Sequence, residues 1–101
     1  MYQVTKRDGA AAPFEIGKIT AAITKAFEAL DKQYHPSVID MLALRVTAHF
    51  EPKIRDGRIA VEDIQDSVEA ILSEAGYADV AKAYILYRKQ REKIRNLNST
   101  M

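Results

Sequence analysis

Apolar residues recur at helical spacing in four stretches of the chain. In each stretch they return every three or four positions, which places them on one face of a helix. The four stretches cover about residues 16–30, 36–50, 61–75 and 78–94. Pro52 lacks a backbone donor just after the second stretch, and Gly76 suits the left-handed conformation in which helices commonly end. The pattern therefore predicts four amphipathic helices.

A β-hairpin is predicted before the first helix. The pair Asp8-Gly9 lies between extended residues and favours a type I′ turn, in which both central residues have positive φ. A two-residue loop of this kind would give the pairs Arg7–Ala10, Lys6–Ala11 and Val4–Pro13. Because side chains alternate along a strand, Val4 and Lys6 would project from one face, and Thr5 and Arg7 from the other.

A third strand is predicted at residues 59–61, which follow a second Arg-Asp-Gly tripeptide at residues 55–57. An isolated hairpin is marginally stable in water and gains from another strand and from helices packed on one face. We expect both tripeptides to form turns. The predicted fold class is therefore α+β, a four-helix bundle capped by a small three-stranded sheet that begins with an N-terminal β-hairpin.

Composition limits the chemistry of the chain. Its 101 residues, 48% of them hydrophobic, suit one globular domain with one modest core. The formal charge of +1 gives no overall basic field of the kind that drives sequence-independent nucleic-acid binding. The absence of Cys excludes disulfides, thiolate zinc sites and cysteine nucleophiles. No secretory or membrane-spanning segment is visible, so we expect a cytoplasmic protein with no membrane partner.

The sequence contains no pattern typical of a catalytic or metal site. Gly17-Lys18 is not a P-loop, because that motif needs a Gly where Ala12 stands and a hydroxyl residue where Ile19 stands. His35 and His49 have no carboxylate or thiol at ligand spacing. We therefore expect no catalytic residue, no metal ligand and no enzyme activity in this segment by itself.

Three cations near the hairpin form a candidate phosphate site. Lys6 and Arg7 stand at the turn, and Lys18 lies in the first turn of the first predicted helix. Unpaired N–H groups at a helix N-terminus, with cations close by, favour a bound phosphate. Surface cations beside turns are also common without a ligand, so these residues alone leave both interpretations open.

Several separated motifs together resemble the ATP-cone, the allosteric adenine-nucleotide domain found at the N-terminus of ribonucleotide reductases. They cover about residues 3–95, in the order and spacing of that family. The motifs are 4–9 (VTKRDG), 13–15 (PFE), 61–65 (VEDIQ), 76–77 (GY) and 80–88 (VAKAYILYR), with Lys18, Ile19, Ala22, Ile23, Val68, Glu69 and Leu72 between them. The last motif, with Arg91 and Arg95, is most similar to the anaerobic, glycyl-radical class.

The resemblance implies which residues hold the phosphates of ATP or dATP. Lys6 and Arg7 at the hairpin and Lys18 on the first helix would bind them, with Lys82 closing over the triphosphate from the opposite side. Lys serves as a point charge for this task, whereas Arg can grip two oxygens at once. Asp8-Gly9 would set the turn. The resemblance also leaves room for Mg²⁺ bound with the nucleotide.

The same resemblance implies contacts to the base. Val4, Ile19 and Ile64 would sandwich the adenine, and either Glu15 or Gln65 would accept its amino protons. Glu15 stands where many cones have a shorter Asp or Asn, so a ribose contact or a role at the helix N-terminus is an alternative for it.

The implied function is allosteric regulation of a ribonucleotide reductase, and hence of deoxyribonucleotide synthesis. ATP would activate the enzyme and dATP would inhibit it. The implied partners are adenine nucleotides, a catalytic domain of the same full-length chain and a possible second copy of the cone. Residues 1–95 would form the nucleotide-binding domain, and residues 96–101 a loose end that begins a linker.

Three other interpretations remain at this stage. The family includes the cone of a transcriptional repressor of reductase genes, although there the cone follows a four-cysteine zinc ribbon and this chain has no Cys. A helical nucleic-acid-binding module could use the basic end of the last helix, but cations at a helix C-terminus are also favourable without nucleic acid, so we do not expect this partner. A structural dimerisation domain would leave the cations near the hairpin without a ligand.

Overall fold

The computed structural model describes residues 2–99, and the side chains of residues 2–93. The elements are β1 (Gln3–Thr5), β2 (Ala11–Pro13), α1 (Ile16–Ala29), α2 (Pro36–Phe50), the 3-10 helix η1 (Glu51–Lys53), β3 (Arg58–Ala60), α3 (Val61–Glu74) and α4 (Ala78–Ser99). The predicted α+β class is confirmed. Residues 96–99, expected to be a loose end, continue α4, because no Gly or Pro interrupts the chain after Gly76.

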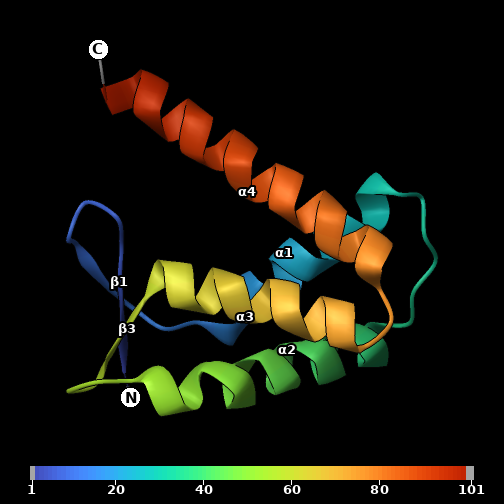
Figure 1. The fold of residues 1–101 in the computed structure, drawn as a ribbon, viewed down its shortest axis with the longest axis horizontal. Helices are drawn as coiled ribbons and strands as arrows, with labels where there is room; N and C mark the ends of the chain where they lie inside the picture. The colour runs from blue at the N-terminus through green and yellow to red at the C-terminus, as the bar shows by residue number, and fades with distance from the viewer. Residues whose placement is uncertain (1, 100–101) are drawn as a thin grey trace.

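The four helices pack in a closed ring. Contacts join α1 to α2, α2 to α3, α3 to α4 and α4 back to α1. Figure 1 shows the strands at one end of this bundle, and the C-terminal half of α4 extending away from the other helices towards that same end. The sheet and the second half of α4 therefore border one region of the molecule.

The sheet has the order β2-β1-β3. Strand β1 pairs antiparallel with β2 and parallel with β3. The third strand is thus confirmed, although it ends at Ala60 and Val61 already opens α3. Because β3 runs directly into α3, the sheet fixes where the first turn of this helix begins.

The prediction of a two-residue hairpin turn is wrong, because the strand pairing is shifted by one residue. The observed pairs are Gln3–Pro13, Val4–Ala12 and Thr5–Ala11. The Lys6 carbonyl accepts from the Gly9 N–H at 2.9 Å, and the Lys6 N–H donates to the Ala10 carbonyl at 2.8 Å. Only Gly9 in this loop has positive φ, so the turn is of the three-residue type, with a bulge at Gly9. Asp8 stays at negative φ and accepts from the Ala10 N–H.

The type I′ turn occurs instead at the second Arg-Asp-Gly tripeptide. Asp56 and Gly57 have φ of 52° and 70°. Arg55 and Arg58 exchange two backbone hydrogen bonds of 2.9 Å across them. The two tripeptides therefore form turns, as predicted, but of different types.

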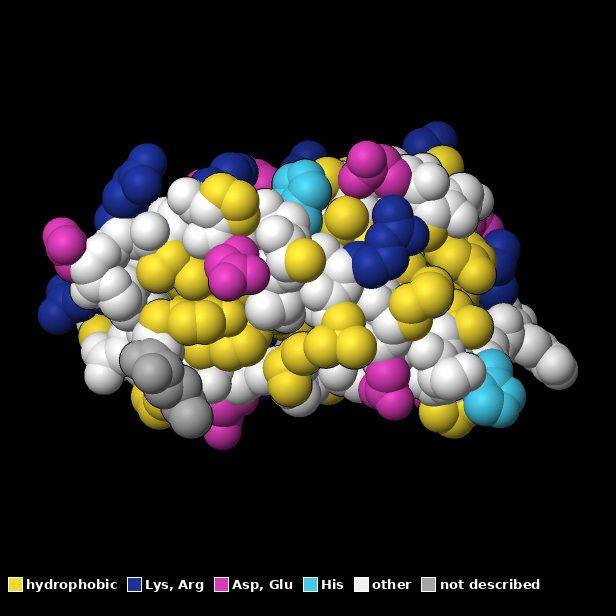
Figure 2. Space-filling model, turned by 90° about the horizontal axis from the view of Figure 1, so that it is seen from below, with side chains coloured by type: hydrophobic (Ala, Val, Ile, Leu, Met, Phe, Trp, Pro, Cys, Tyr) yellow, Lys and Arg dark blue, Asp and Glu magenta, His cyan; other side chains and the backbone are white. Residues whose placement is uncertain are grey.

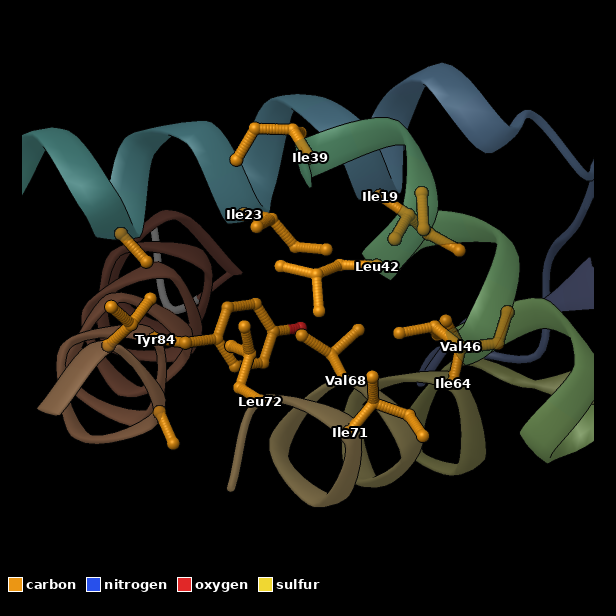
Figure 3. Packing of buried hydrophobic residues seen from close by; sticks show 14 of the residues in the cluster. Ile19, Ile23, Ile39, Leu42, Val46, Ile64, Val68, Ile71, Leu72 and Tyr84 are labelled. Atoms are coloured by element: carbon orange, nitrogen blue, oxygen red, sulfur yellow. The ribbon is translucent and has the colours of Figure 1, made fainter. Parts of the chain in front are cut away.

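All four helices and β3 contribute to one hydrophobic core. Figure 3 shows apolar side chains of α1, α2 and α3 directed toward a common centre, with the Tyr84 ring of α4 beside them. The buried residues include Ile19, Ile23, Phe27, Ile39, Leu42, Val46, Phe50, Ile59, Ile64, Val68, Ile71, Leu72, Val80 and Tyr84. This core fixes the helices against one another and thus the walls of any site between them.

An aromatic cluster holds the sheet against the end of α2. The rings of Tyr2 and Phe14 stack at 4.8 Å, and Phe50 meets them edge-on at 6.1 Å and 5.6 Å. Tyr2 and Phe14 flank the hairpin strands in sequence, so this contact gives the small sheet a fixed position on the bundle.

The surface on the side of α2 carries both apolar and charged side chains. Figure 2, which views the molecule from that side, shows hydrophobic patches interrupted by charged side chains. Met41 and Leu44 are among the exposed apolar residues on α2. Of the helices described here, none combines the length and the apolar character that crossing a lipid bilayer requires.

The turn at residues 56–57 gives a first testable prediction. Gly57→Ala should lower the free energy of unfolding by about 1–2 kcal/mol, because an L residue at φ of 70° is strained. Gly17→Ala is the matched control, since Gly17 is helical and an added Cβ meets nothing within 4 Å at either position. It should raise stability by up to about 1 kcal/mol. Urea unfolding of both variants measures the difference, and equal effects would contradict the turn assignment.

Candidate functional site

A cavity of about 400 Å³ lies between the hairpin, α1, α3 and α4. Its size falls within the usual range of small-molecule sites. The charged side chains that line it are Lys6, Arg7, Lys18, Lys25, Arg88, Arg91, Glu15 and Glu92. Six cations thus face two carboxylates, so the cavity carries a local positive excess in a chain of nearly neutral overall charge.

The three-residue loop explains how the hairpin supplies its cations. Arg7 was predicted to leave the sheet on the face opposite Val4 and Lys6. In the structure Arg7 belongs to the loop and not to a strand, so strand alternation does not govern its direction. As a result, Val4, Lys6 and Arg7 all line the same cavity.

The structure brings most of the predicted site residues together. The cavity is lined by Val4, Lys6, Arg7, Glu15, Lys18, Ile19, Ile64 and Gln65. Asp8 and Gly9 lie in the hairpin loop and shape it without lining the cavity. Lys82 is not brought to this site: it lines a separate hollow between α1 and α4, beside Leu30 and Leu86.

Six polar residues that line the cavity were not predicted as site residues: Lys25, Tyr84, Tyr87, Arg88, Arg91 and Glu92. Lys25 lies on α1 two turns beyond Lys18, and Tyr87, Arg88 and Arg91 lie on α4. The signal was present as spacing, because Lys18 and Lys25 share one helical face, and Arg91 follows Tyr84 and Tyr87 at helical intervals. The missing information was the rotation of α4 about its axis, which places Arg91 toward the cavity and Lys82 away from it.

Carboxylates neutralise some of the cavity cations. The Nε of Arg7 lies 3.1 Å from Glu62 and its Nη2 contacts Glu92. Lys18 lies 3.4 Å from Glu15. None of the ion pairs found among residues 2–93 involves Lys6, Lys25 or Arg91. These three side chains therefore supply positive charge that no carboxylate in the described part of the chain offsets.

Arg88 is held more firmly than the other cations. Its Nη1 lies 3.1 Å from Asp66 and 2.8 Å from Glu69, and its side chain is only 16% exposed. Burial works against the charged form, but the two hydrogen-bonded carboxylates outweigh it and raise the pKa of Arg88. Arg88 thus acts mainly as a fixed link between α3 and α4.

Tyr87 connects two of the unneutralised cations. Arg91 donates to the Tyr87 hydroxyl at 3.0 Å, and the Lys25 Nζ lies 5.5 Å from the centre of the ring. Burial opposes ionisation of the phenol, yet the Arg91 hydrogen bond and the two positive charges outweigh it and lower the pKa of Tyr87. Tyr87 therefore lies beside two positive charges.

Gln65, one of the residues that line the cavity, carries an unsatisfied acceptor. Its Oε1 is buried, and no hydrogen bond to it occurs within the described part of the chain. Such a group costs about 1–3 kcal/mol when it stays unpaired, so it favours a ligand that donates a hydrogen bond. Ile19 and Ile64, which are 6% and 8% exposed, line the same cavity. The wall therefore combines apolar surface with one acceptor.

Two helix N-termini add to the positive character. Neither Glu15, the N-cap of α1, nor Ala60, the N-cap of α3, makes a side-chain capping bond. Glu15 and Val61, at the starts of these helices, both line the cavity. Uncapped N–H groups of a helix attract anions. The site is thus suited to a ligand with an anionic part and an apolar part that donates a hydrogen bond.

The chain belongs to the ATP-cone family. The sequence model described as "ATP cone domain" matches residues 2–93. This finding confirms the family resemblance seen in the sequence motifs, and it agrees with the arrangement of four helices and a small sheet.

Curated relatives are reductases of several types. The chain is 38% identical to a vitamin B12-dependent ribonucleoside-diphosphate reductase of Mycobacterium tuberculosis, over 98% of this chain and 14% of the relative. It is 42% identical to a ribonucleoside-diphosphate reductase subunit alpha of Chlamydia pneumoniae, over 91% and 9%. An anaerobic ribonucleoside-triphosphate reductase of Haemophilus influenzae is 34% identical, over 99% and 14%. These identities do not single out the anaerobic class. The chain spans 14% or less of the length of these relatives.

Tyr84, at the base of the cavity, gives a prediction on pH dependence. Burial raises the pKa of Tyr84 to about 12 from its ordinary value of 10.0. Because the folded state favours the neutral phenol, this stabilisation is complete below pH 10 and declines between pH 10 and 12, where the unfolded chain ionises first. The decline should be about 1.4 kcal/mol per pH unit. Tyr84→Phe should lack this component, which urea unfolding of both proteins at several pH values would measure. Parallel stability curves would contradict the assignment.

Proposed function

We propose that this domain binds ATP or dATP in the cavity between the hairpin, α1, α3 and α4, and that it sets the overall activity of a ribonucleotide reductase. The observation that carries the proposal is the excess of cations around a cavity with one buried, unpaired acceptor, in a chain of the ATP-cone family. ATP would activate the enzyme and dATP would inhibit it. The domain has a regulatory role and no chemistry of its own.

The phosphates would lie among the cations of three elements. Lys6 and Arg7 reach the cavity from the hairpin, Lys18 and Lys25 from α1, and Arg91 from α4. Charge-assisted hydrogen bonds to phosphate are stronger than neutral ones, and Arg can bind two oxygens at once. The proposed phosphate site therefore includes Lys6, Arg7 and Lys18, as the sequence suggested. Arg91, and not Lys82, would close over the triphosphate from the opposite side.

The adenine would lie between the apolar walls. Val4, Ile19 and Ile64 contribute these walls, and the Gln65 Oε1 would accept a hydrogen from the adenine amino group. Glu15 lies at the start of α1, where it pairs with Lys18, and would contact the ribose or the base edge. A ligand that satisfies Gln65 would recover the free energy that its unpaired oxygen costs.

Regulation requires that ATP and dATP stabilise different states. The two ligands differ only in the ribose 2′-hydroxyl, so their opposite effects would arise from differential contacts that shift an equilibrium. The partners would be a catalytic domain of the same chain, joined to this domain by a linker after α4, and a second copy of the cone. The cytoplasm would be the site of action.

Mg²⁺ would enter with the nucleotide. The part of the chain that the structure describes holds no group of three or more metal-ligating side chains. Phosphate oxygens and water would therefore supply most ligands of the ion, as is common for Mg²⁺ at nucleotide sites.

Substitution of the phosphate-binding cations tests the proposal. Lys6→Ala, Lys18→Ala and Arg91→Ala should each weaken ATP binding about tenfold or more, because each removes a charge-assisted contact. Lys82→Ala is the matched control on α4 and should change Kd less than about twofold, since Lys82 lines the other hollow. Isothermal titration calorimetry measures all four. Unchanged affinity in the three cavity variants would refute the phosphate assignment.

The base contact can be tested through nucleotide selectivity. Gln65→Leu keeps a similar volume but removes the acceptor, so it should weaken ATP binding about tenfold and change GTP binding much less. Guanine presents a carbonyl where adenine presents its amino group, so the variant should lose preference for adenine. Thermal shifts with ATP and GTP, followed by calorimetry, give the ratio. An equal loss for both nucleotides would show that Gln65 does not read the base.

A further inference from the structure

Arg7 differs from the other cations proposed to bind phosphate, because two acids from distant elements already hold it. Its guanidinium contacts Glu62 in the first turn of α3 and Glu92 in the second half of α4. The three side chains are each 32–40% exposed. One residue of the hairpin loop thereby connects the hairpin to two helices across the side of the cavity.

The contact with Glu92 has a particular place in the fold. Among the side-chain hydrogen bonds and ion pairs of residues 2–93, it alone joins the hairpin to α4. The part of α4 that it reaches is the half that extends beyond the other helices in Figure 1. The ion pair is thus placed to hold that half of the helix toward the sheet.

Within residues 2–93, Glu92 has one other ion-pair partner, Arg88. The Nε of Arg88 lies 4.0 Å from Glu92, but Arg88 is already bound by Asp66 and Glu69 at 3.1 Å and 2.8 Å. Among the ion-pair partners found within residues 2–93, loss of Arg7 would therefore leave Glu92 with one distant partner. The position of this part of α4 relative to the hairpin would depend on which anion Arg7 binds.

We infer that Arg7 forms an electrostatic latch with Glu62 and Glu92, and that the phosphates of the bound nucleotide open it. This inference rests on the proposed function, since it assumes that the polyphosphate enters the cavity. Exposed ion pairs are weak, whereas a triphosphate carries several charges and offers Arg7 paired oxygens. Arg7 therefore binds the phosphates of the nucleotide in place of Glu92, and Glu92 loses this ion pair. By linkage, whatever pulls the second half of α4 away from the hairpin strengthens nucleotide binding.

A double-mutant cycle separates the latch from simple repulsion between Glu92 and phosphate. Glu92→Gln should tighten ATP binding about three- to fivefold, because Arg7 no longer has to leave this acid. In an Arg7→Ala background the same substitution should change Kd less than about twofold. Glu74→Gln is the charge-matched control: no ion pair with Glu74 occurs among residues 2–93, and it should leave Kd unchanged.

Each result of the double-mutant cycle either supports or overturns the latch. Equal tightening by Glu92→Gln with and without Arg7 would mean that Glu92 only repels the ligand, and the latch would be overturned. Absence of any ATP binding by the unmodified chain would overturn the proposed function and the latch together. Melting temperatures of all variants establish that each is folded before its affinity is compared.

A distance measurement tests the movement itself. The chain has no Cys, so spin labels at Ala10→Cys and Lys89→Cys would report only the hairpin-to-α4 distance. Both positions are exposed and neither lines the cavity. Saturating ATP should shift the distance distribution measured by double electron–electron resonance, and Glu92→Gln without ATP should move it the same way. An unchanged distribution in ATP-saturated protein would overturn the latch while leaving the proposed binding site intact.

Discussion

Mutual repulsion among cations is the constraint around which this structure is arranged. Six of them line one cavity, and the fold keeps them there by neutralising some and leaving others unpaired. Arg88 is fixed by Asp66 and Glu69, and Arg7 is shared by two glutamates. Lys6, Lys25 and Arg91 remain as charges that an anionic ligand can neutralise. The cavity therefore has a local positive excess that an anionic ligand would reduce.

The rest of the fold holds these charges near one another. The ring of helix contacts and the shared core fix α1, α3 and α4 as three walls, and the aromatic cluster of Tyr2, Phe14 and Phe50 fixes the sheet as the fourth. A close-packed core resists small displacements, so the backbone positions from which these cations extend are fixed. Repulsion is thus balanced by burial of apolar surface elsewhere in the domain.

The sequence predicted the elements well and the local geometry less well. Helical spacing identified all four helices, because burial of an apolar face is a strong and repeated signal. The two Arg-Asp-Gly turns could not be told apart, since the same tripeptide forms a bulged three-residue loop at residues 7–9 and a type I′ turn at 56–57, depending on strand register. The direction of Arg7 follows from that difference. Lys82 and Arg91 likewise share one helix, and only tertiary packing of α4 decides which faces the cavity.

These geometric details determine how a nucleotide could act at a distance. Had the hairpin closed with the predicted two-residue turn, Arg7 would point from the other face of the sheet and contact neither Glu62 nor Glu92. The bulged loop instead places Arg7 where it contacts two carboxylates of the protein and also lines the cavity. If α4 leads into the proposed catalytic domain, a contact that depends on the partner of Arg7 would lie on the path toward that domain. A single extra residue in a turn would therefore be enough to connect the proposed phosphate binding to the position of a helix.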